Sequence, residues 1–392
     1  MKELTAPAPP SKINEITGAA TELRRERSMA STYGFIGLGL IGGSIAKGLR
    51  SAEPDCRILA YMRTRARLEL ARSEGIVDLA LSGIDDALAE CDIIFLCTPV
   101  EYNESYLSRL KPLLKPGAFI TDVGSTKSSI QRTVEQLSME QLFIGGHPMA
   151  GSEKSGYEYS DPLLLENIFY LLCPTAKTPP AFTARMEALV RSLRANPYVI
   201  TAAEHDQAVA TISHLPHLVA AALVNLVQDT DSERHTMKQL AAGGFKDITR
   251  IASSSPVMWQ QIFSSNRAAV SAVLRQYISA MEAIEQALLT DDMSAIHELF
   301  TRSGSFRSQL ADEHGLMNAQ YSFSVHVADR PGAISIISAI LAAGGVSIKN
   351  IGINHNRESG DGALRIEFYD ADSCLKAEHL VQKYNFVIEA RK

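Results

Sequence analysis

The sequence predicts an α/β fold with a doubly wound, Rossmann-type parallel sheet, then an all-helical domain and a ferredoxin-like module. From residue 33 to 174, apolar runs such as "YGFIGLG" and "DIIFLCTPV" alternate with segments of helical period, the pattern of a parallel sheet covered on both faces. From about residue 206 to 312, nearly every segment has helical period. After residue 320, the order strand, helix, strand, strand, helix, strand is typical of a ferredoxin-like (βαββαβ) module.

These changes of pattern predict four segments. We expect an N-terminal extension at 1–30, a dinucleotide-binding Rossmann domain at 31–180, a helical substrate and dimerisation domain at 181–315, and the ferredoxin-like module at 320–392. Within the helical domain, the run "HDQAVATISHLPHLVAAALVNLVQ" is apolar over much of its circumference. Such a helix suits burial between domains or between subunits.

Composition excludes several classes of protein. With 392 residues, 46% of them hydrophobic, the chain is long enough to bury a sizeable core. A net charge of −6 with scattered Lys and Arg argues against a nucleic-acid partner. We expect no apolar stretch of transmembrane length and no signal peptide, and the five cysteines have no framework spacing. The sequence therefore predicts a cytoplasmic protein with reduced thiols and no membrane partner.

A GxGxxG pattern occupies residues 37–42, directly after a predicted strand and at the mouth of a predicted helix. Glycines at this place allow a tight turn and let a pyrophosphate approach the N–H groups of the helix N-terminus. A glycine-rich turn without a ligand is the plainer alternative. The residues expected to bind the cofactor are Gly37, Leu38, Gly39, Leu40, Ile41, Gly42, Arg63, Thr64, Thr98 and Pro99.

The end of the second strand bears on the choice between NAD and NADP. The dinucleotide fingerprint expects an acidic residue there to bind the adenosine ribose, but the chain has Met62 followed by Arg63. Without a carboxylate to repel a 2′-phosphate, and with a guanidinium to pair with it, NADP is favoured slightly over NAD. The alternative is that these arginines only begin a solvated helix.

Two further segments end predicted strands at the same edge of the sheet, where ligands of open α/β sheets bind. In "TDVGSTK", Ser125 is placed to hydrogen-bond a ligand and Lys127 to attract an anion, although Ser125 or Thr126 capping a helix is an alternative. In "FIGGHPMAG", His147 is placed to accept a proton from a hydroxyl group, as alcohol oxidation requires. On spacing alone, a structural histidine remains the more frequent case.

The helical region adds two groups of polar residues. His214 and His217 are three residues apart but have no third ligand at a usual spacing, so we expect no metal site. Further on, Arg250 lies near two other charged residues and precedes the chain's only tryptophan. An arginine fork that clamps a carboxylate is what a dianionic substrate needs.

Taken together, the segments "GFIGLGLIGGS", "FLCTPV", "TDVGSTK", "GGHPMAGSEKSG", "HDQAVATISHLPHLVAAAL" and "GGFKDITRIA" resemble the prephenate dehydrogenase family. They occur in the family's order and span residues 33 to about 260. The segment "ADRPGAISIISAILAAGGVSIKNIGI" is similar to an ACT domain, a module that binds a regulatory amino acid.

The resemblance implies the oxidative decarboxylation of prephenate to 4-hydroxyphenylpyruvate, with reduction of NAD(P)+, in tyrosine biosynthesis. It implies that His147 accepts the hydrogen bond of the substrate hydroxyl, that Ser125 orients histidine and substrate, and that Arg250 binds a carboxylate. It also implies a homodimer formed through the helical domain, and an ACT ligand expected to be tyrosine. The substrate-binding positions so implied are Ser213, His217, Lys246, Asp247 and Trp259, and the regulatory ones are Asp329, Pro331, Gly332, Asn350 and Ile351.

Three alternatives stay open. Arogenate dehydrogenase is the nearest one, because the motifs do not separate a pyruvyl from an amino-acid side chain on the substrate. A dehydrogenase of β-hydroxy acids would need a catalytic lysine in the helical domain, and no feature singles one out. A catalytically silent amino-acid sensor is disfavoured by the joint presence of His147, Ser125 and Arg250.

Overall fold

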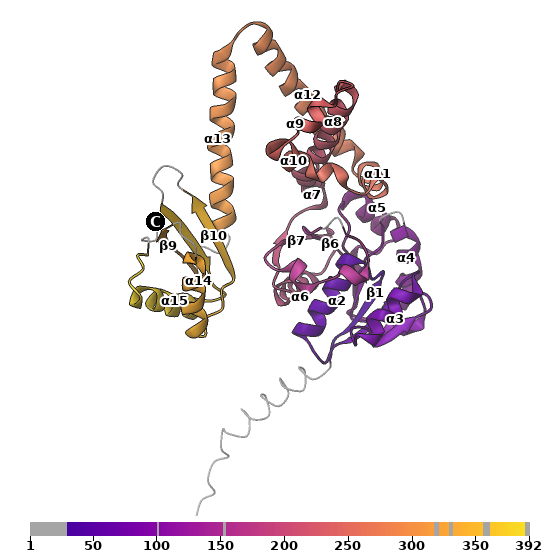
Figure 1. Ribbon diagram of the computed structural model, residues 1–392. Coiled ribbons are helices and arrows are strands. Elements are labelled where there is room, and N and C mark those ends of the chain that lie inside the picture. Colours follow the sequence, from indigo (N-terminus) through magenta and orange to yellow (C-terminus); the bar gives the residue numbers. More distant parts are fainter. Residues whose placement is uncertain are drawn as a thin grey trace, which may run out of the picture. The chain divides into compact units, whose positions relative to one another are not determined.

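The computed structural model describes residues 30–99, 102–151, 154–316, 321–328, 332–355 and 361–388. The chain divides into two compact units, Met1–Ser279 and Ala280–Lys392 (Figure 1), and each is described by itself. Two residues of the expected regulatory site, Asp329 and Pro331, lie outside the described residues.

The first unit contains one eight-stranded sheet of order β3-β2-β1-β4-β5-β6-β7-β8. Its strands are β1 (Thr32–Ile36), β2 (Arg57–Tyr61), β3 (Leu79–Leu81), β4 (Ile93–Leu96), β5 (Phe119–Asp122), β6 (Phe143–Pro148), β7 (Phe169–Pro174) and β8 (Asn196–Val199). The first six run parallel, which confirms the Rossmann-type sheet.

The last two strands depart from the expectation of a parallel sheet, because β7 is antiparallel to β6 and β8 continues parallel to β7. The described residues between β6 and β7 form only the short 3-10 turns Tyr157–Tyr159 and Pro162–Leu165. A parallel return requires a longer crossover, usually a helix. With β8 at its edge, the sheet also extends past residue 180, where we expected the α/β domain to end.

Helices cover both faces of this sheet. The helices α2 (Leu40–Ala52), α3 (Arg65–Ser73) and α6 (Pro180–Ser192) pack on one face, and α4 (Asn103–Leu110) and α5 (Ser128–Gln136) on the other. The strands alternate accordingly: Phe35 and Phe95 stack on the first face with ring centroids 4.9 Å apart, whereas Ile36 and Leu96 lie in the second core. Both faces are buried, which is why these strands are apolar throughout.

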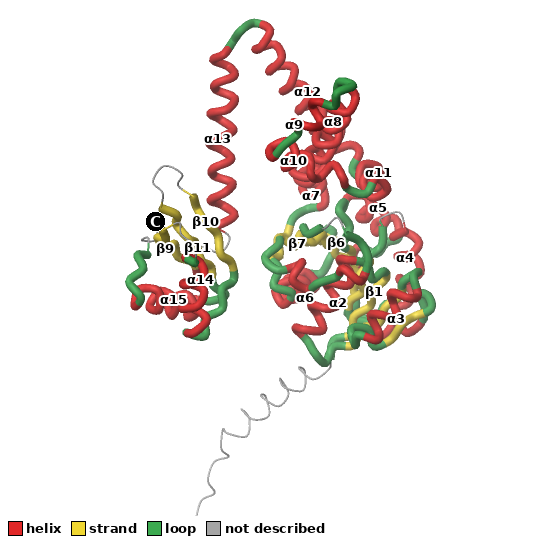
Figure 2. The backbone as a smooth tube through the Cα atoms, in the orientation of Figure 1, coloured by secondary structure: helices red, strands yellow, loops and turns green. Residues whose placement is uncertain are grey.

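Residues 202–279, all described, form helices and loops, as Figure 2 shows from α7 to α12, and the expected helical region is confirmed. Its helices are α7 (Ala202–Val209), a π-helical turn (Ala210–His214), α8 (Leu215–Thr230), α9 (Thr236–Leu240), α10 (Gly243–Thr249), a 3-10 turn (Arg250–Ser253), α11 (Pro256–Ser265) and α12 (Arg267–Leu289), which continues into the second unit.

The expectation that no apolar stretch reaches transmembrane length is wrong for one helix. The π-helical turn and Pro216 do not interrupt the helix, so Ala202–Thr230 is continuous and, by length and composition alone, apolar enough to cross a membrane. Only 22% of the most apolar 18-residue stretch of this helix is buried. Helices that pack in protein cores meet the same length and composition test, so this observation by itself does not indicate a membrane.

The second unit contains a small antiparallel sheet of order β10-β11-β9. Its elements are α13 (Met293–Leu316), β9 (Ser322–Ala328), α14 (Ala333–Ala343), β10 (Asn350–His355), β11 (Asp361–Glu367) and α15 (Ala371–Lys383). The helices and strands bury a core that includes Val325, Ile337 and Val381. Of the last expected strand, the described residues show a single antiparallel bridge between Ile388 and Val325.

Candidate active site

The glycine-rich turn between β1 and α2 leaves room for a ligand. Gly37 has a φ of 93°, and its N–H donates to the carbonyl of Tyr61 at 2.7 Å. A Cβ on Gly42 would lie 2.7 Å from the carbonyl oxygen of Gly37, so this position must be glycine. A Cβ on Gly39, at the N-terminus of α2, would instead meet nothing within 4 Å, and no described side chain caps the helix. The turn from Gly37 to Gly42, which we call the glycine cradle, fits the pyrophosphate of a dinucleotide.

Two neighbouring cavities lie along this edge of the sheet and share Arg63, Thr98 and Pro99. The smaller one, of about 290 Å³, contains the expected cofactor residues Gly37, Leu38, Gly39, Arg63, Thr64, Thr98 and Pro99 among its lining. The remaining expected ones, Leu40, Ile41 and Gly42, form the first turn of α2 beneath the cradle.

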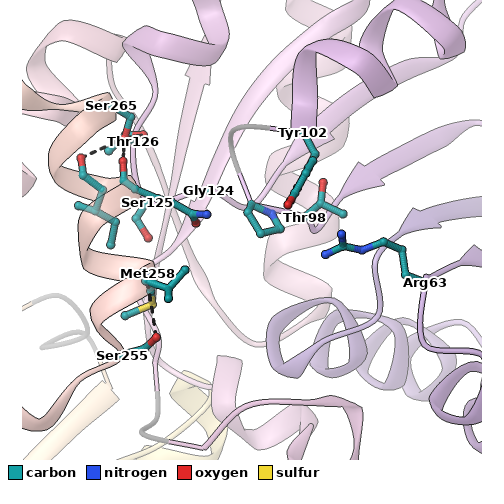
Figure 3. Close-up of a pocket in the computed structure, with 13 residues that line it drawn as sticks. Arg63, Thr98, Tyr102, Gly124, Ser125, Thr126, Ser255, Met258 and Ser265 are labelled. Carbon is teal, nitrogen blue, oxygen red and sulfur yellow. Dashed lines mark hydrogen bonds between the residues drawn. The ribbon is translucent and has the colours of Figure 1, made fainter.

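The larger cavity, of about 430 Å³, lies between the loop after β5 and helix α11. Figure 3 shows Ser125 and Thr126 near Met258 on one side, and Thr98 and Arg63 on the other. Ser125, a predicted catalytic residue, is therefore at a cavity wall. Every residue of this cavity belongs to the first unit.

Arginines are present instead of an acidic residue at the end of the smaller cavity where we expect the adenosine ribose of the cofactor. The Arg63 guanidinium lies over the ring of Tyr102, 4.9 Å from its centroid. Arg67, which also lines the smaller cavity, donates to Glu158 at 2.6 Å. Met62 packs against the apolar core and lines the same cavity. The side chains at this end of the cavity are thus cationic or neutral.

His147 is the fifth residue of β6 and is buried, with 9% of its surface exposed. The backbone before it is held closely, because a Cβ on Gly146 would lie 2.5 Å from the carbonyl oxygen of Asp122. The Asp122 carboxylate accepts the N–H of Gly146 at 3.1 Å, and Lys127 Nζ donates to the Gly146 carbonyl at 2.8 Å. These contacts fix the end of the strand that carries His147.

Lys127 does not have the role we expected. Its side chain is buried, with 1% exposed, and its ammonium group pairs with the Asp122 carboxylate. A lysine so enclosed and neutralised is not available to attract an anion at the surface. The expectation failed because sequence spacing places Lys127 after the strand but does not say that Asp122, at the end of β5, lies beneath it.

A chain of two histidines and an aspartate ends at His147. His147 Nδ1 lies 2.8 Å from Nε2 of His205, and His205 Nδ1 lies 2.9 Å from Oδ1 of Asp206. Sequence reasoning missed His205 and Asp206. The signal was available, since Ala202, His205, Asp206 and Val209 share the buried face of α7 at helical spacing. Polar side chains on a buried helix face are expected to form hydrogen bonds with other buried groups.

Burial and hydrogen bonding determine the protonation states of these two histidines and the aspartate at neutral pH. Desolvation lowers the pKa of His147 well below its usual value, and nearby positive charge on Lys127 or a protonated His205 lowers it further. Burial also lowers the pKa of His205 and takes that of His214 to about 4. Burial alone would raise the pKa of Asp206, but hydrogen bonds from His205, Ser128 and Lys127 outweigh it and lower that pKa to about 2. His147 is therefore neutral and Asp206 ionised.

The hydrogen bonds at the N-terminus of α5 bear on whether the segment "GSTK" serves to bind a ligand or to cap the helix. The N-cap residue of the helix is Lys127, and its side chain makes no capping hydrogen bond. The N–H groups of Lys127 and Ser128 donate instead to the Asp206 carboxylate, at 2.7 and 2.8 Å. Thr126 donates to the hydroxyl of Ser265 at 3.0 Å. The Asp206 carboxylate thus takes the place of a cap from this segment, and the Thr126 hydroxyl is used elsewhere.

The predicted substrate residues fall into two groups. His217 Nδ1 donates to the carbonyl of Ser213 at 2.8 Å, and its ring centroid lies 3.9 Å from that of Trp259. The buried indole Nε1 of Trp259 has no hydrogen-bond partner among the described residues. Arg250, at the start of the 3-10 turn after α10, is exposed. Two neighbouring charged residues on α10, Lys246 and Asp247, are also exposed.

A glycine cradle for a dinucleotide and a neutral histidine lie at the carboxyl ends of parallel strands of one sheet, and this is what the oxidation of an alcohol requires. The protein is a nicotinamide-dependent oxidoreductase. Comparison with known proteins narrows the class. The family model described as "Prephenate dehydrogenase, nucleotide-binding domain" matches residues 45–199, and "Prephenate dehydrogenase, dimerization domain" matches residues 201–302.

Relatives and solved structures agree with these matches. The prephenate dehydrogenase of Bacillus subtilis (strain 168) is 36% identical over 357 residues, which cover 90% of this chain and 96% of the relative. The structure of A. aeolicus prephenate dehydrogenase in complex with hydroxyphenyl propionate and NAD+ has a TM-score of 0.68 at 29% identity, covering 72% of this chain and 99% of that one. Synechocystis arogenate dehydrogenase has a TM-score of 0.65 at 32% identity, with coverages of 71% and 99%. The chain belongs to the prephenate dehydrogenase family.

Proposed function

We propose that this protein catalyses the oxidative decarboxylation of prephenate to 4-hydroxyphenylpyruvate and uses His147 as the base. The observation that carries the proposal is the neutral, buried imidazole of His147 at the end of β6, on the sheet edge that also bears the glycine cradle. A base that is unprotonated at neutral pH is ready to accept a proton, and burial keeps water from competing for it.

When bound, a nicotinamide cofactor would supply the acceptor for the hydride that leaves the substrate carbon bearing the 4-hydroxyl group. His147 takes the hydroxyl proton as the C–H bond breaks, and Ser125, at the wall of the larger cavity, orients the same hydroxyl. Loss of CO2 from the ring supplies the electron pair that makes it aromatic. The proton then returns from His147 to the phenolic oxygen, so the reaction releases no net proton and His147 is neutral again.

Cationic and polar groups of the helical segment are proposed to hold the carboxylates of the substrate. Arg250 supplies a guanidinium fork for one carboxylate, with the two charged residues of α10 beside it. His217 directs its Nδ1–H to Ser213, which leaves its Nε2 for a ligand, and the unpartnered indole N–H of Trp259 is a second donor next to it.

NADP is our proposed cofactor in preference to NAD. Arg63 and Arg67 line the smaller cavity, and Met62 stands where a carboxylate would repel a 2′-phosphate. Among the described residues, Arg63 lies over Tyr102 in a cation–π contact, a weak interaction that a phosphate can replace. NAD remains the alternative, with the two arginines serving the surface of α3.

A homodimer formed through the helical segment would cover the apolar helix Ala202–Thr230, of whose most apolar window 22% is buried within one chain. The match to a dimerisation domain supports it. We also propose that residues 320–392 form an ACT module that binds tyrosine. Gly332, at φ 88° directly before α14, and Asn350 and Ile351, at the start of β10, are its described binding residues. A cytoplasmic location accords with five free cysteines.

A single steady-state experiment tests these proposals together. The purified protein is given prephenate or arogenate with NAD+ or NADP+, with and without tyrosine, and absorbance at 340 nm is followed. We expect turnover with prephenate, a higher kcat/KM with NADP+ and inhibition by tyrosine. Turnover with arogenate alone would reassign the substrate, and no turnover with any pair would overturn the enzyme proposal.

A further inference from the structure

We propose that His205 and Asp206 are positioning residues that hold His147 in the tautomer with a proton on Nδ1, so that its Nε2 lone pair faces the substrate. The inference rests on the proposed function for its catalytic consequence, but the tautomer itself is a property of the protein alone. It concerns two residues of α7 that would act only through His147.

Both carboxylate oxygens of Asp206 are hydrogen-bond acceptors. Oδ1 accepts the N–H of Lys127 at 2.7 Å and Oδ2 accepts the N–H of Ser128 at 2.8 Å. Backbone N–H groups can only donate, and these two hydrogen bonds, with one from the Ser128 side chain, favour the ionised form of the carboxyl. His205 Nδ1, 2.9 Å from Oδ1, must therefore carry a proton and donate it to Asp206.

His205 is neutral in the folded protein. Burial lowers the pKa of this imidazole, so only one of its nitrogens is protonated, and that nitrogen is Nδ1. Its Nε2 is then an acceptor. Since His147 Nδ1 lies 2.8 Å from this atom, the proton between the two rings belongs to His147. The remaining ring nitrogen of His147, Nε2, is left with its lone pair, which is the form that a base needs.

The surroundings of His147 favour this single arrangement. The charged and titratable groups that act on it are His205 and Asp206 from α7, His214 from the π-helical turn, and Lys127 from the loop after β5, which is paired with Asp122. Lys127 opposes a second positive charge, whereas the Asp206 carboxylate favours one. A proton accepted by His147 during the reaction is thus stabilised through His205 by the only anion of this group that is not neutralised by Lys127.

The test compares two amides of different length at position 205. In His205→Gln the side-chain amide reaches the place of Nε2, and its oxygen can accept the Nδ1–H of His147. In His205→Asn the amide reaches only the place of Nδ1, so it meets Asp206 but not His147. We expect His205→Gln to keep kcat within about tenfold of the wild type and His205→Asn to lower it by about 10²- to 10⁴-fold, with the KM for prephenate little changed in both.

The control is His297→Gln, a substitution at an exposed histidine of α13, which should leave both constants unchanged. Thermal unfolding of all three variants shows whether they are folded. Equal kcat values for folded His205→Gln and His205→Asn would overturn the proposal, because a merely structural role does not depend on which atom of His205 is replaced.

A second measurement does not require activity or a substitution at position 205. Two-bond 1H–15N spectra of the protein labelled at its histidines distinguish an Nδ1–H from an Nε2–H imidazole, and the His147→Asn variant identifies the signals of His147. We expect the Nδ1–H tautomer at pH 7.5. An Nε2–H tautomer would overturn the proposal even in an active enzyme, whereas an Nδ1–H tautomer in a protein inactive with prephenate would overturn only the proposed function.

Discussion

Asp206 and Lys127, 79 residues apart in the chain, are joined by a hydrogen bond of 2.7 Å from the Lys127 backbone N–H to the Asp206 carboxylate. Through it, a side chain of α7 caps the N-terminus of α5 on the sheet. The same carboxylate also accepts from His205, so the cap and the histidine chain share one anion. The helical segment and the catalytic edge of the sheet are therefore fixed to each other by a group that also orders the site.

Replacing Asp206 with alanine should lower the free energy of unfolding by about 2–4 kcal/mol, because a helix cap is lost and buried N–H groups are left unpaired. Urea unfolding measures the change. Asp161→Ala is the matched control, since Asp161 is exposed and caps the 3-10 turn Pro162–Leu165, so its loss should cost about 1 kcal/mol. Equal losses of unfolding free energy in the two variants would contradict the prediction that the Asp206 cap stabilises the fold more than an exposed cap does.

Replacing His147 with asparagine should lower kcat by about 10²- to 10⁴-fold with little change in KM, since a general base acts in the transition state. Initial rates at saturating prephenate and cofactor measure it, with circular dichroism to verify folding. A variant that is folded and keeps the kcat of the wild type would exclude His147 as the base.

Replacing Arg250 with glutamine should chiefly raise the KM for prephenate, by about 10- to 100-fold, because a carboxylate clamp acts in the ground state and the transition state alike. Arg191→Gln, at an exposed position of α6 where the arginine pairs with Glu187 four residues away, is the control and should keep the normal KM. A normal KM together with a large loss of kcat in Arg250→Gln would assign Arg250 to the chemical step instead.

Replacing Arg63 with alanine should raise the KM for NADP+ by about tenfold or more and leave that for NAD+ within about threefold, because a charge-assisted contact with the 2′-phosphate is lost. Arg65→Ala is the control, since Arg65 pairs with Glu69 on the surface of α3. If Arg63→Ala affects both cofactors equally, Arg63 does not select between them.

The stability of the protein should fall as the pH falls below about 6.5, the ordinary pKa of histidine in an unfolded chain. His147, His205 and His214 have lowered pKa values in the fold, so the unfolded chain binds more protons than the folded one in this range. Each neutral histidine contributes about 1.4 kcal/mol per pH unit below that value. Urea unfolding at pH 7.5, 6.5 and 5.5 measures the slope, which His147→Asn should reduce. A stability independent of pH between 7.5 and 5.5 would contradict the buried, neutral state.

Much of the fold could be predicted because its signals are local. The glycines at 37, 39 and 42 act within one turn, and the alternation of Phe35 with Ile36 shows that both faces of the sheet are covered. The reversal of β7 could not be predicted in this way. An apolar strand has the same composition in either direction, and only the connection from β6 decides which way it runs.

By itself, the sequence determined the Rossmann-type sheet, the helical region, the family and the position of His147 at the end of a strand. Tertiary structure alone decided what surrounds that histidine. It buried Lys127 against Asp122 and brought His205, 58 residues further along the chain, to the ring of His147, with Asp206 on the other nitrogen of His205. Hydrogen bonds and desolvation depend on distances between segments that are far apart in sequence, and packing of α7 against the sheet edge sets those distances.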